Sequence, residues 1–120
     1  MTTPEKKVKD KVKKLLAEHG AYYFMPATGG YGKSGVFDIV ACYKGRFIGI
    51  EVKADCTKKP TGLQSKNALL ANAMGADVLL IHDQNIDALK HIFMEIDNEQ
   101  TNRPDGECIW VFDSNTKSPS

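Results

Sequence analysis

Two runs of β-branched and aromatic residues, 36–43 and 46–53, are separated only by Lys44 and Gly45. Glycine readily takes the positive φ that a tight hairpin turn needs. The pattern therefore predicts two antiparallel strands joined by a two-residue loop. This hairpin constrains the rest of the chain, because its register decides which side chains share a face of the sheet.

The two-residue loop pairs Tyr43 with Arg46, and counting outward along both strands places Asp38 opposite Glu51. Directly opposed residues hold their Cβ atoms about 4.5–5.5 Å apart on one face, and Lys53 shares that face because it is two residues beyond Glu51. Two carboxylates forced together repel, so a purely structural sheet would avoid this arrangement. A divalent cation relieves the repulsion, and carboxylate oxygens suit Mg²⁺ or Mn²⁺. The hairpin therefore predicts a metal site beside a lysine.

Hydrophobic periodicity predicts an α/β fold with the order αβββαβαβ, in which a mixed sheet is flanked by helices. The expected helices cover 4–19, 63–74 and a segment capped by Asn85, and the expected strands cover 21–25, 36–43, 46–53, 78–81 and 108–112. The face of the hairpin opposite the acids is expected to form the core, with Phe37, Ile39, Ala41, Ile48, Ile50 and Val52. The apolar stripes of the first and third helices are expected to complete it, with Val8, Val12, Leu15 and Leu16 in one and Ile86, Leu89, Ile92, Phe93 and Ile96 in the other. The continuous apolar run 78–81 predicts a fully buried strand.

Asp38 followed by Glu51-Val52-Lys53 resembles the PD-(D/E)xK nuclease motif. The segment 34–38, and Gly62-Leu63-Gln64 at the start of a helix, are more specifically similar to the VRR-NUC branch, the virus-type replication and repair nucleases. The resemblance extends from Glu5 to His82. One departure is Phe37, which stands where the superfamily commonly has a structural proline.

The resemblance implies a restriction-endonuclease-like core and a metal-dependent DNA endonuclease that hydrolyses phosphodiester bonds. It further implies selectivity for branched or Holliday-junction-like DNA in replication, repair or recombination, and a homodimer. Asp38, Glu51 and the backbone carbonyl of Val52 would hold Mg²⁺ or Mn²⁺, and Lys53 would position the attacking water. Gln64 would contact either the lysine or the nucleic acid.

Glu5 lies three residues before Val8, so it is expected on the buried face of the first helix. It can form a capping box with Thr2, or it can reach the site as a third carboxylate, as the resemblance implies.

Contacts with nucleic acid are expected from the glycine-rich loop 26–35, through Tyr31, Lys33 and Ser34, and from Lys58 and Lys59. The same loop is not a phosphate-binding P-loop, since Ala27 occupies the place of the first glycine and a strand follows instead of a helix. The six lysines of the first helix are most simply a solvated surface, with phosphate contact as the alternative.

The 120 residues suit one domain, expected over 1–113, followed by a disordered polar tail at 114–120. A net charge of +1 does not by itself indicate a nucleic-acid binder. The three cysteines (Cys42, Cys56 and Cys108) are widely spaced and predict neither disulfides nor a zinc site. No signal peptide or membrane-length apolar run is present, so a cytoplasmic protein is expected (host cytoplasm, if viral).

Two other functions remain open from the sequence. One is a sequence-specific restriction-type endonuclease, and the other is a non-catalytic nucleic-acid-binding module. His82, at the end of the strand 78–81, could be a ligand or base, or a residue that only hydrogen-bonds at the strand end.

Overall fold

The computed structural model describes residues 2–27 and 35–99, which form three helices and four strands. In chain order these elements are α1 (Pro4–Glu18), β1 (Tyr22–Phe24), β2 (Ile39–Tyr43), β3 (Arg46–Val52), α2 (Gly62–Ala73), β4 (Asp77–Ile81) and α3 (Asp87–Glu99). The first six follow the predicted order αβββαβ. The predicted strand 108–112 and the predicted tail 114–120 lie outside the described residues.

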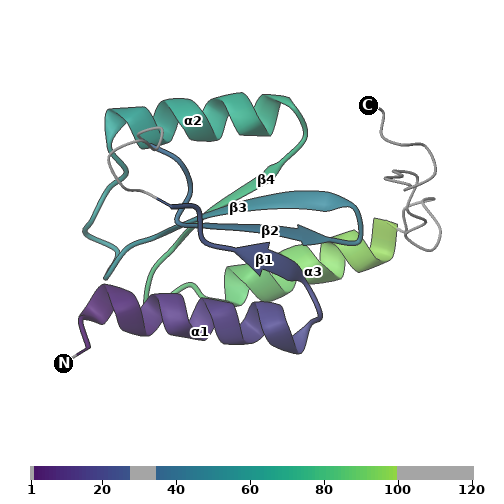
Figure 1. Ribbon diagram of the computed structural model, residues 1–120, viewed down its shortest axis with the longest axis horizontal. Coiled ribbons are helices and arrows are strands. Elements are labelled where there is room, and N and C mark those ends of the chain that lie inside the picture. The colour runs from purple at the N-terminus through teal and green to yellow at the C-terminus, as the bar shows by residue number, and fades with distance from the viewer. Residues whose placement is uncertain (1, 28–34, 100–120) are drawn as a thin grey trace, which may run out of the picture.

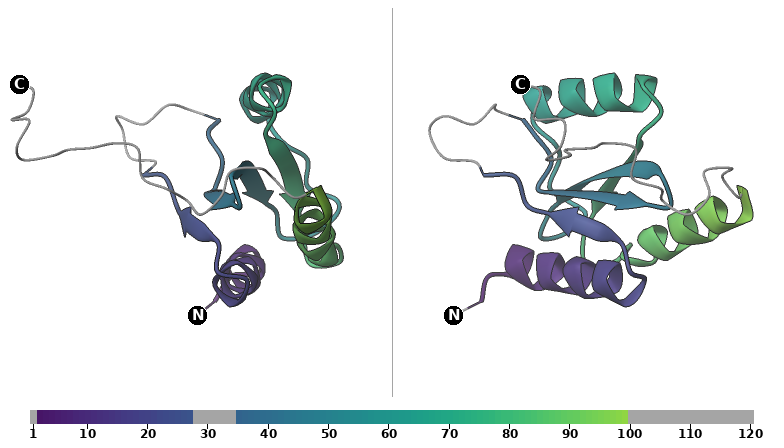
Figure 2. Two further views of the ribbon diagram at one scale, coloured as in Figure 1. Left: turned by 90° about the vertical axis from the view of Figure 1, so that its right-hand side faces the viewer. Right: turned by 45° about the vertical axis from the view of Figure 1, so that its right-hand side comes forward.

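The strands form one mixed sheet in the order β1-β2-β3-β4. The first three strands are antiparallel, and β3 and β4 are parallel. α2 covers one face of the sheet, while α1 and α3 lie side by side on the other (Figures 1 and 2). The predicted α/β class with a mixed sheet between helices is therefore confirmed. No helix in the described part of the chain is both long and apolar enough to cross a membrane.

The β2–β3 hairpin has the predicted register, with Tyr43 paired to Arg46. Lys44 and Gly45 have φ angles of 49° and 86°, the pair of positive values typical of the type I′ turn. This turn matches the right-handed twist of the flanking strands and fixes which residues share a face.

The core lies between the sheet and the α1–α3 layer. It contains most of the predicted apolar stripes of both helices and of the predicted hairpin face, while Leu15, Ile86 and Ile92 are only partly buried and pack against it. One predicted residue, Phe37, lies elsewhere. The buried members of the core are Val8, Val12, Leu16, Ile39, Ala41, Tyr43, Ile48, Ile50, Val52, Ile81, Leu89, Phe93 and Ile96.

The exception is Phe37, which is buried but lies on the opposite face of the sheet, toward α2. β2 begins only at Ile39, so the alternation of a strand does not extend back to Phe37. Its ring occupies the space above Gly49, where an added Cβ would lie 2.5 Å from Phe37 Cε2. The expectation that Phe37 joins the Ile39 face was therefore wrong.

We expect Gly49→Ala to lower the free energy of unfolding by about 1–3 kcal/mol, because the added methyl group must displace a buried ring. Urea denaturation measures the change. Gly62→Ala is the matched control, since a Cβ there meets nothing within 4 Å. Equal effects of the two substitutions would contradict the close approach of Phe37.

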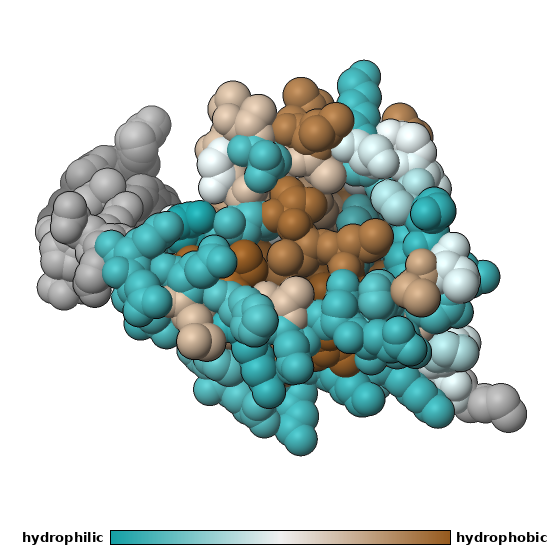
Figure 3. Space-filling model, turned by 180° about the vertical axis from the view of Figure 1, so that it is seen from behind, coloured by the Kyte–Doolittle hydropathy of each residue, from teal (hydrophilic) through white to brown (hydrophobic). Residues whose placement is uncertain are grey.

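The α2 side of the molecule is less buried than the sequence predicts. In β4 only Ile81 is buried, so the expectation of a fully buried strand was wrong. No residue of α2 is buried, and Figure 3 shows hydrophobic side chains gathered over it on the rear face. These exposed apolar residues of α2 and its C-cap are Leu63, Leu69, Leu70 and Met74. The cause is topological, because within the described residues β4 is an edge strand and only one helix covers this face.

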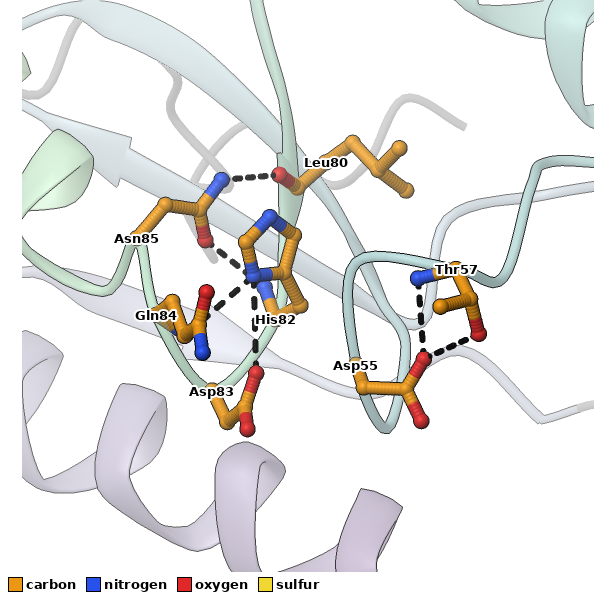
Figure 4. A network of polar contacts seen from close by, with 7 residues as sticks. All are labelled: Asp55, Thr57, Leu80, His82, Asp83, Gln84 and Asn85. Atoms are coloured by element: carbon orange, nitrogen blue, oxygen red, sulfur yellow. Dashed lines mark hydrogen bonds and ion pairs between the residues drawn. The ribbon is translucent and has the colours of Figure 1, made fainter.

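Asn85 was predicted to cap the third helix, but its side chain binds the end of β4 instead (Figure 4). Its Oδ1 accepts a hydrogen bond from His82 N at 2.7 Å, and its Nδ2 donates to the Leu80 carbonyl at 2.9 Å. The side chain thereby closes the turn between β4 and α3, and α3 begins two residues later, at Asp87.

Candidate active site

Asp38, Glu51 and Lys53 lie together at the end of the β2–β3 hairpin. The Asp38 backbone N–H donates to the Ile50 carbonyl at 3.0 Å, which continues the pairing of the hairpin beyond β2. Asp38 Oδ2 accepts from the Val52 backbone N–H at 2.8 Å, and this bond holds the carboxylate against β3. Glu51 is 3% exposed and is the buried charged residue of the described chain. The predicted meeting of the two acids therefore occurs in the structure.

Gln64, in the first turn of α2, bridges Glu51 and Lys53. Its Oε1 accepts from Lys53 Nζ at 3.1 Å, and its Nε2 donates to Glu51 Oε1 at 3.1 Å. The two bonds use both ends of the amide, so they set its orientation. The predicted contact between Gln64 and the lysine is present.

Gln64 is itself held by a capping box with Thr61. Thr61 Oγ1 accepts from the Gln64 backbone N–H at 3.1 Å, and Gln64 Oε1 accepts from the Thr61 backbone N–H at 2.9 Å. The amide oxygen of Gln64 therefore accepts hydrogen bonds from both the Thr61 backbone, at the N-terminus of α2, and the Lys53 ammonium group. The sequence indicated Thr61 only as a helix-capping residue, although the Thr-x-x-Gln spacing is the signal of this reciprocal motif.

Gly35 allows α2 to approach this site closely. It has a φ of 80°, and a Cβ at this position would lie 2.8 Å from the carbonyl carbon and oxygen of Leu63. Only glycine fits both the backbone conformation and the space. The chain leading to Asp38 therefore passes directly against the helix turn that carries Gln64.

The pKa of Glu51 is raised from 4.5 to about 7. Burial is the largest cause, and the adjacent negative charge of Asp38 is the next. The ammonium group of Lys53 opposes the shift, and the more distant charge of Glu5 adds to it. In addition, Glu51 Oε2 is buried and accepts no hydrogen bond from the described residues. The ionised form of Glu51 is therefore only partly compensated by Gln64 and Lys53.

A divalent cation fits these residues. A buried carboxylate oxygen without a donor, beside a second carboxylate, is the place where a positive charge would be most stabilised. No group of three or more His, Cys, Asp or Glu side chains within 2–27 and 35–99 is arranged to hold a metal. That is compatible with Mg²⁺, which commonly uses one or two carboxylates and completes its shell with water and phosphate.

Glu5 occupies a different position from the one predicted. The residue that caps α1 is Thr3, whose Oγ1 accepts from Lys6 N at 3.1 Å, so a capping box between Thr2 and Glu5 was wrong. Glu5 is exposed and does not share the buried face with Val8. Its negative charge nevertheless contributes to the raised pKa of Glu51.

Lys58 and Lys59 are exposed in the segment between β3 and α2, and Tyr31, Lys33 and Ser34 lie outside the described residues. His82 Nδ1 accepts from the Gln84 backbone N–H at 3.2 Å, next to the turn in which Asp55 binds Thr57 (Figure 4). This contact favours the role of a strand-end hydrogen-bonding residue for His82.

The sequence matches no family model and no curated protein. Its structure is similar to a solved chain described as a VRR_NUC domain, with a TM-score of 0.68 at 24% identity. The match covers 75% of this chain and 97% of that one. The chain therefore has the fold of a VRR_NUC domain.

Proposed function

We propose that this protein is a metal-dependent DNA endonuclease that hydrolyses phosphodiester bonds. The observation that carries the proposal is Glu51, a buried carboxylate with an unpartnered oxygen among the described residues, held beside Asp38 and Lys53. The shared fold adds to the expectation of nuclease chemistry. The same side chains would be costly in a protein that only needed a stable sheet.

Asp38 and Glu51 would hold Mg²⁺ or Mn²⁺, with the backbone carbonyl of Val52 as a further ligand and Glu5 acting through water. When bound, such an ion lowers the pKa of water and polarises a phosphate oxygen. The hydrogen bond from Val52 N leaves the other oxygen of Asp38 available for this purpose. Ionisation of Glu51 is a precondition, so binding of the ion releases a proton near neutral pH.

Lys53 would orient the attacking water and stabilise the negative charge that develops on the phosphate. Its ammonium group has three donors, and Gln64 Oε1 accepts one of them. The other donors can bind water and phosphate. Gln64 therefore acts as a positioning residue, and Thr61 fixes its amide through the capping box.

The substrate we propose is DNA recognised by its branched structure. The sequence supplies no motif that reads bases in a groove, and exposed lysines such as Lys58 and Lys59 are suited to phosphate contacts. Structure-selective cutting is therefore favoured over cutting at one short sequence.

A digestion panel tests the proposal directly. Single-stranded, duplex, flapped and four-way DNA are incubated with the protein in Mg²⁺ or Mn²⁺ and in EDTA. We expect cleavage of branched substrates with either metal and none in EDTA. Asp38→Asn serves as the control for contaminating nucleases.

Each rival function predicts a different result in the same panel. Cleavage confined to one short duplex sequence would favour a restriction-type enzyme. Binding of DNA without metal-dependent cutting of any substrate would contradict the proposal and favour a non-catalytic binding module.

A further inference from the structure

A groove of about 600 Å³ runs along the N-terminal half of α1. We call it the α1 groove. The residues of its lining used below are Glu5, Lys6, Lys9, Asp10, Lys13 and Ala54. The segment that leaves β3 passes beside the N-terminal end of α1 (Figure 1). Its residue Ala54 belongs to the lining of the groove. The groove is thus built from two segments that are distant in the sequence.

The α1 groove lies next to the candidate active site. Its lining includes Ala54, which follows Lys53 directly in the chain, and Glu5, whose charge contributes to the raised pKa of Glu51. A strand of nucleic acid whose phosphate sits at Lys53 could therefore continue toward the groove.

Two of the three lysines that line the groove are more buried than the other lysines of α1. Lys9 and Lys13 are half-buried, whereas Lys6, which also lines the groove, is exposed, as are Lys7, Lys11 and Lys14. Long lysine stems that pack against a surface while the charge stays in water present that charge in a restricted place. Lys9 and Lys13 are one helical turn apart, so they form a short row along the groove.

Two carboxylates, Glu5 and Asp10, line the groove beside its three lysines and partly neutralise it. Asp10 pairs with Lys6 at 3.1 Å and with Lys13 at 3.7 Å, and the lysines lower the pKa of Asp10. Lys9 makes no ion pair within the part of the chain that the structure describes. A phosphate that enters the groove could therefore bind Lys9 directly. Lys6 and Lys13 could also bind it by giving up their ion pairs with the exposed carboxylate of Asp10.

Lys11 and Lys14 face away from this groove. They line a separate hollow between α1 and the start of α3, together with Glu18, Asp87 and Lys90. Five of the six lysines of α1 therefore line two separate hollows, and of these only the α1 groove includes the residue that follows Lys53.

We propose that the α1 groove holds the phosphate backbone of the DNA strand next to the scissile bond, with Lys9 and Lys13 as its contacts. This inference rests on the proposed nuclease function and adds the path of the substrate. From residue 3 to residue 13 the helix rises about 15 Å, which corresponds to about four nucleotides at about 3.4 Å each. Contacts of this kind fix the position of the DNA and carry no base information.

The test compares two double variants that remove the same charge from the same helix. Lys9→Ala/Lys13→Ala alters the groove, and Lys11→Ala/Lys14→Ala alters the other surface. Binding of a fluorescein-labelled duplex is followed by anisotropy in EDTA, across about 50–200 mM salt, the range over which phosphate contacts are most evident. Thermal unfolding confirms that each variant is folded.

We expect the groove variant to bind roughly tenfold more weakly near about 0.1 M salt, with its log-affinity salt slope reduced by about 1.8, because each lost phosphate contact removes about 0.9. In Mg²⁺ its KM should rise while kcat changes little. The Lys11/Lys14 variant should match the wild type, and Lys9→Arg/Lys13→Arg should retain binding because it keeps the charge.

Equal weakening by both double variants would overturn the inference, since it would show only general attraction to a basic helix. No weakening by the groove variant would also overturn it. Neither result bears on cleavage by the wild type, so a wild-type protein that cleaves DNA would leave the proposed function standing. A wild-type protein that neither binds nor cleaves DNA would overturn both.

Discussion

Glu51→Gln is expected to abolish metal-dependent cleavage and, at the same time, to stabilise the metal-free protein above neutral pH. Loss of a metal ligand should lower kcat by about 1000-fold or more, since the ion supplies several kcal/mol of transition-state stabilisation. The amide oxygen introduced by this substitution could still accept the hydrogen bond that Gln64 Nε2 donates to Glu51, so the local contacts survive the change.

The stability effect follows from the raised pKa of Glu51. The native protein holds this proton between pH 4.5 and about 7, whereas the unfolded chain releases it near 4.5. Stability present at low pH is therefore lost as pH rises through about 7, and the neutral glutamine avoids that loss. We expect the variant to gain about 1–3 kcal/mol in free energy of unfolding at about pH 8.5 in EDTA, and little below pH 4.5.

Urea denaturation at several pH values measures this difference, and saturating Mg²⁺ should stabilise the wild type but not the variant. Glu95→Gln, at an exposed carboxylate of α3, is the matched control and should change neither property. A Glu51→Gln protein that cleaves at the wild-type rate would contradict the metal-ligand role. One that is less stable at high pH would contradict the buried, only partly compensated charge.

Lys53→Met is expected to lower kcat by about 100- to 1000-fold, while weakening DNA binding in the absence of metal only by the loss of one phosphate contact. Methionine keeps the length of the side chain and removes the ammonium group that Gln64 orients. Removing this cation should also raise the pKa of Glu51 further, because Lys53 opposes the shift in the wild type. The pH at which cleavage begins should therefore move upward.

Single-turnover cleavage across a pH series separates these two effects. Lys53→Arg should recover only part of the rate, since a planar guanidinium does not reproduce a compact ammonium group. Lys66→Met, at an exposed lysine of α2, is the control for general loss of charge. An unchanged rate in Lys53→Met with full folding would remove Lys53 from the mechanism.

The central hairpin could be predicted from sequence because its register depends on local chemistry alone. Lys44-Gly45 selects the turn, and the turn pairs Tyr43 with Arg46 and, further along, Ile39 with Ile50. The next residues of the two strands, Asp38 and Glu51, therefore lie beside each other. The same logic failed at Phe37, since alternation holds only within a strand and β2 starts two residues later. Local pattern was therefore sufficient where the backbone is regular.

Features set by tertiary packing could not be derived in this way. The apolar spacing of α2 does not reveal that the helix covers an edge strand and stays exposed. Asparagine is a common helix-capping residue, but the Asn85 side chain instead hydrogen-bonds the backbone of Leu80 and His82 at the end of β4. Helical periodicity predicted that Glu5 is buried with Val8, but Glu5 is exposed, although its charge still acts on Glu51. The homodimer implied by the resemblance stays a prediction.

The measurement closest to the central proposal is the anomalous difference density of a crystal soaked in Mn²⁺. A single peak between the carboxylates of Asp38 and Glu51, lost in crystals of Asp38→Asn, is the predicted result. Carboxylate oxygens that point apart, or density with no peak between them, would contradict a shared cation and with it the proposed enzyme.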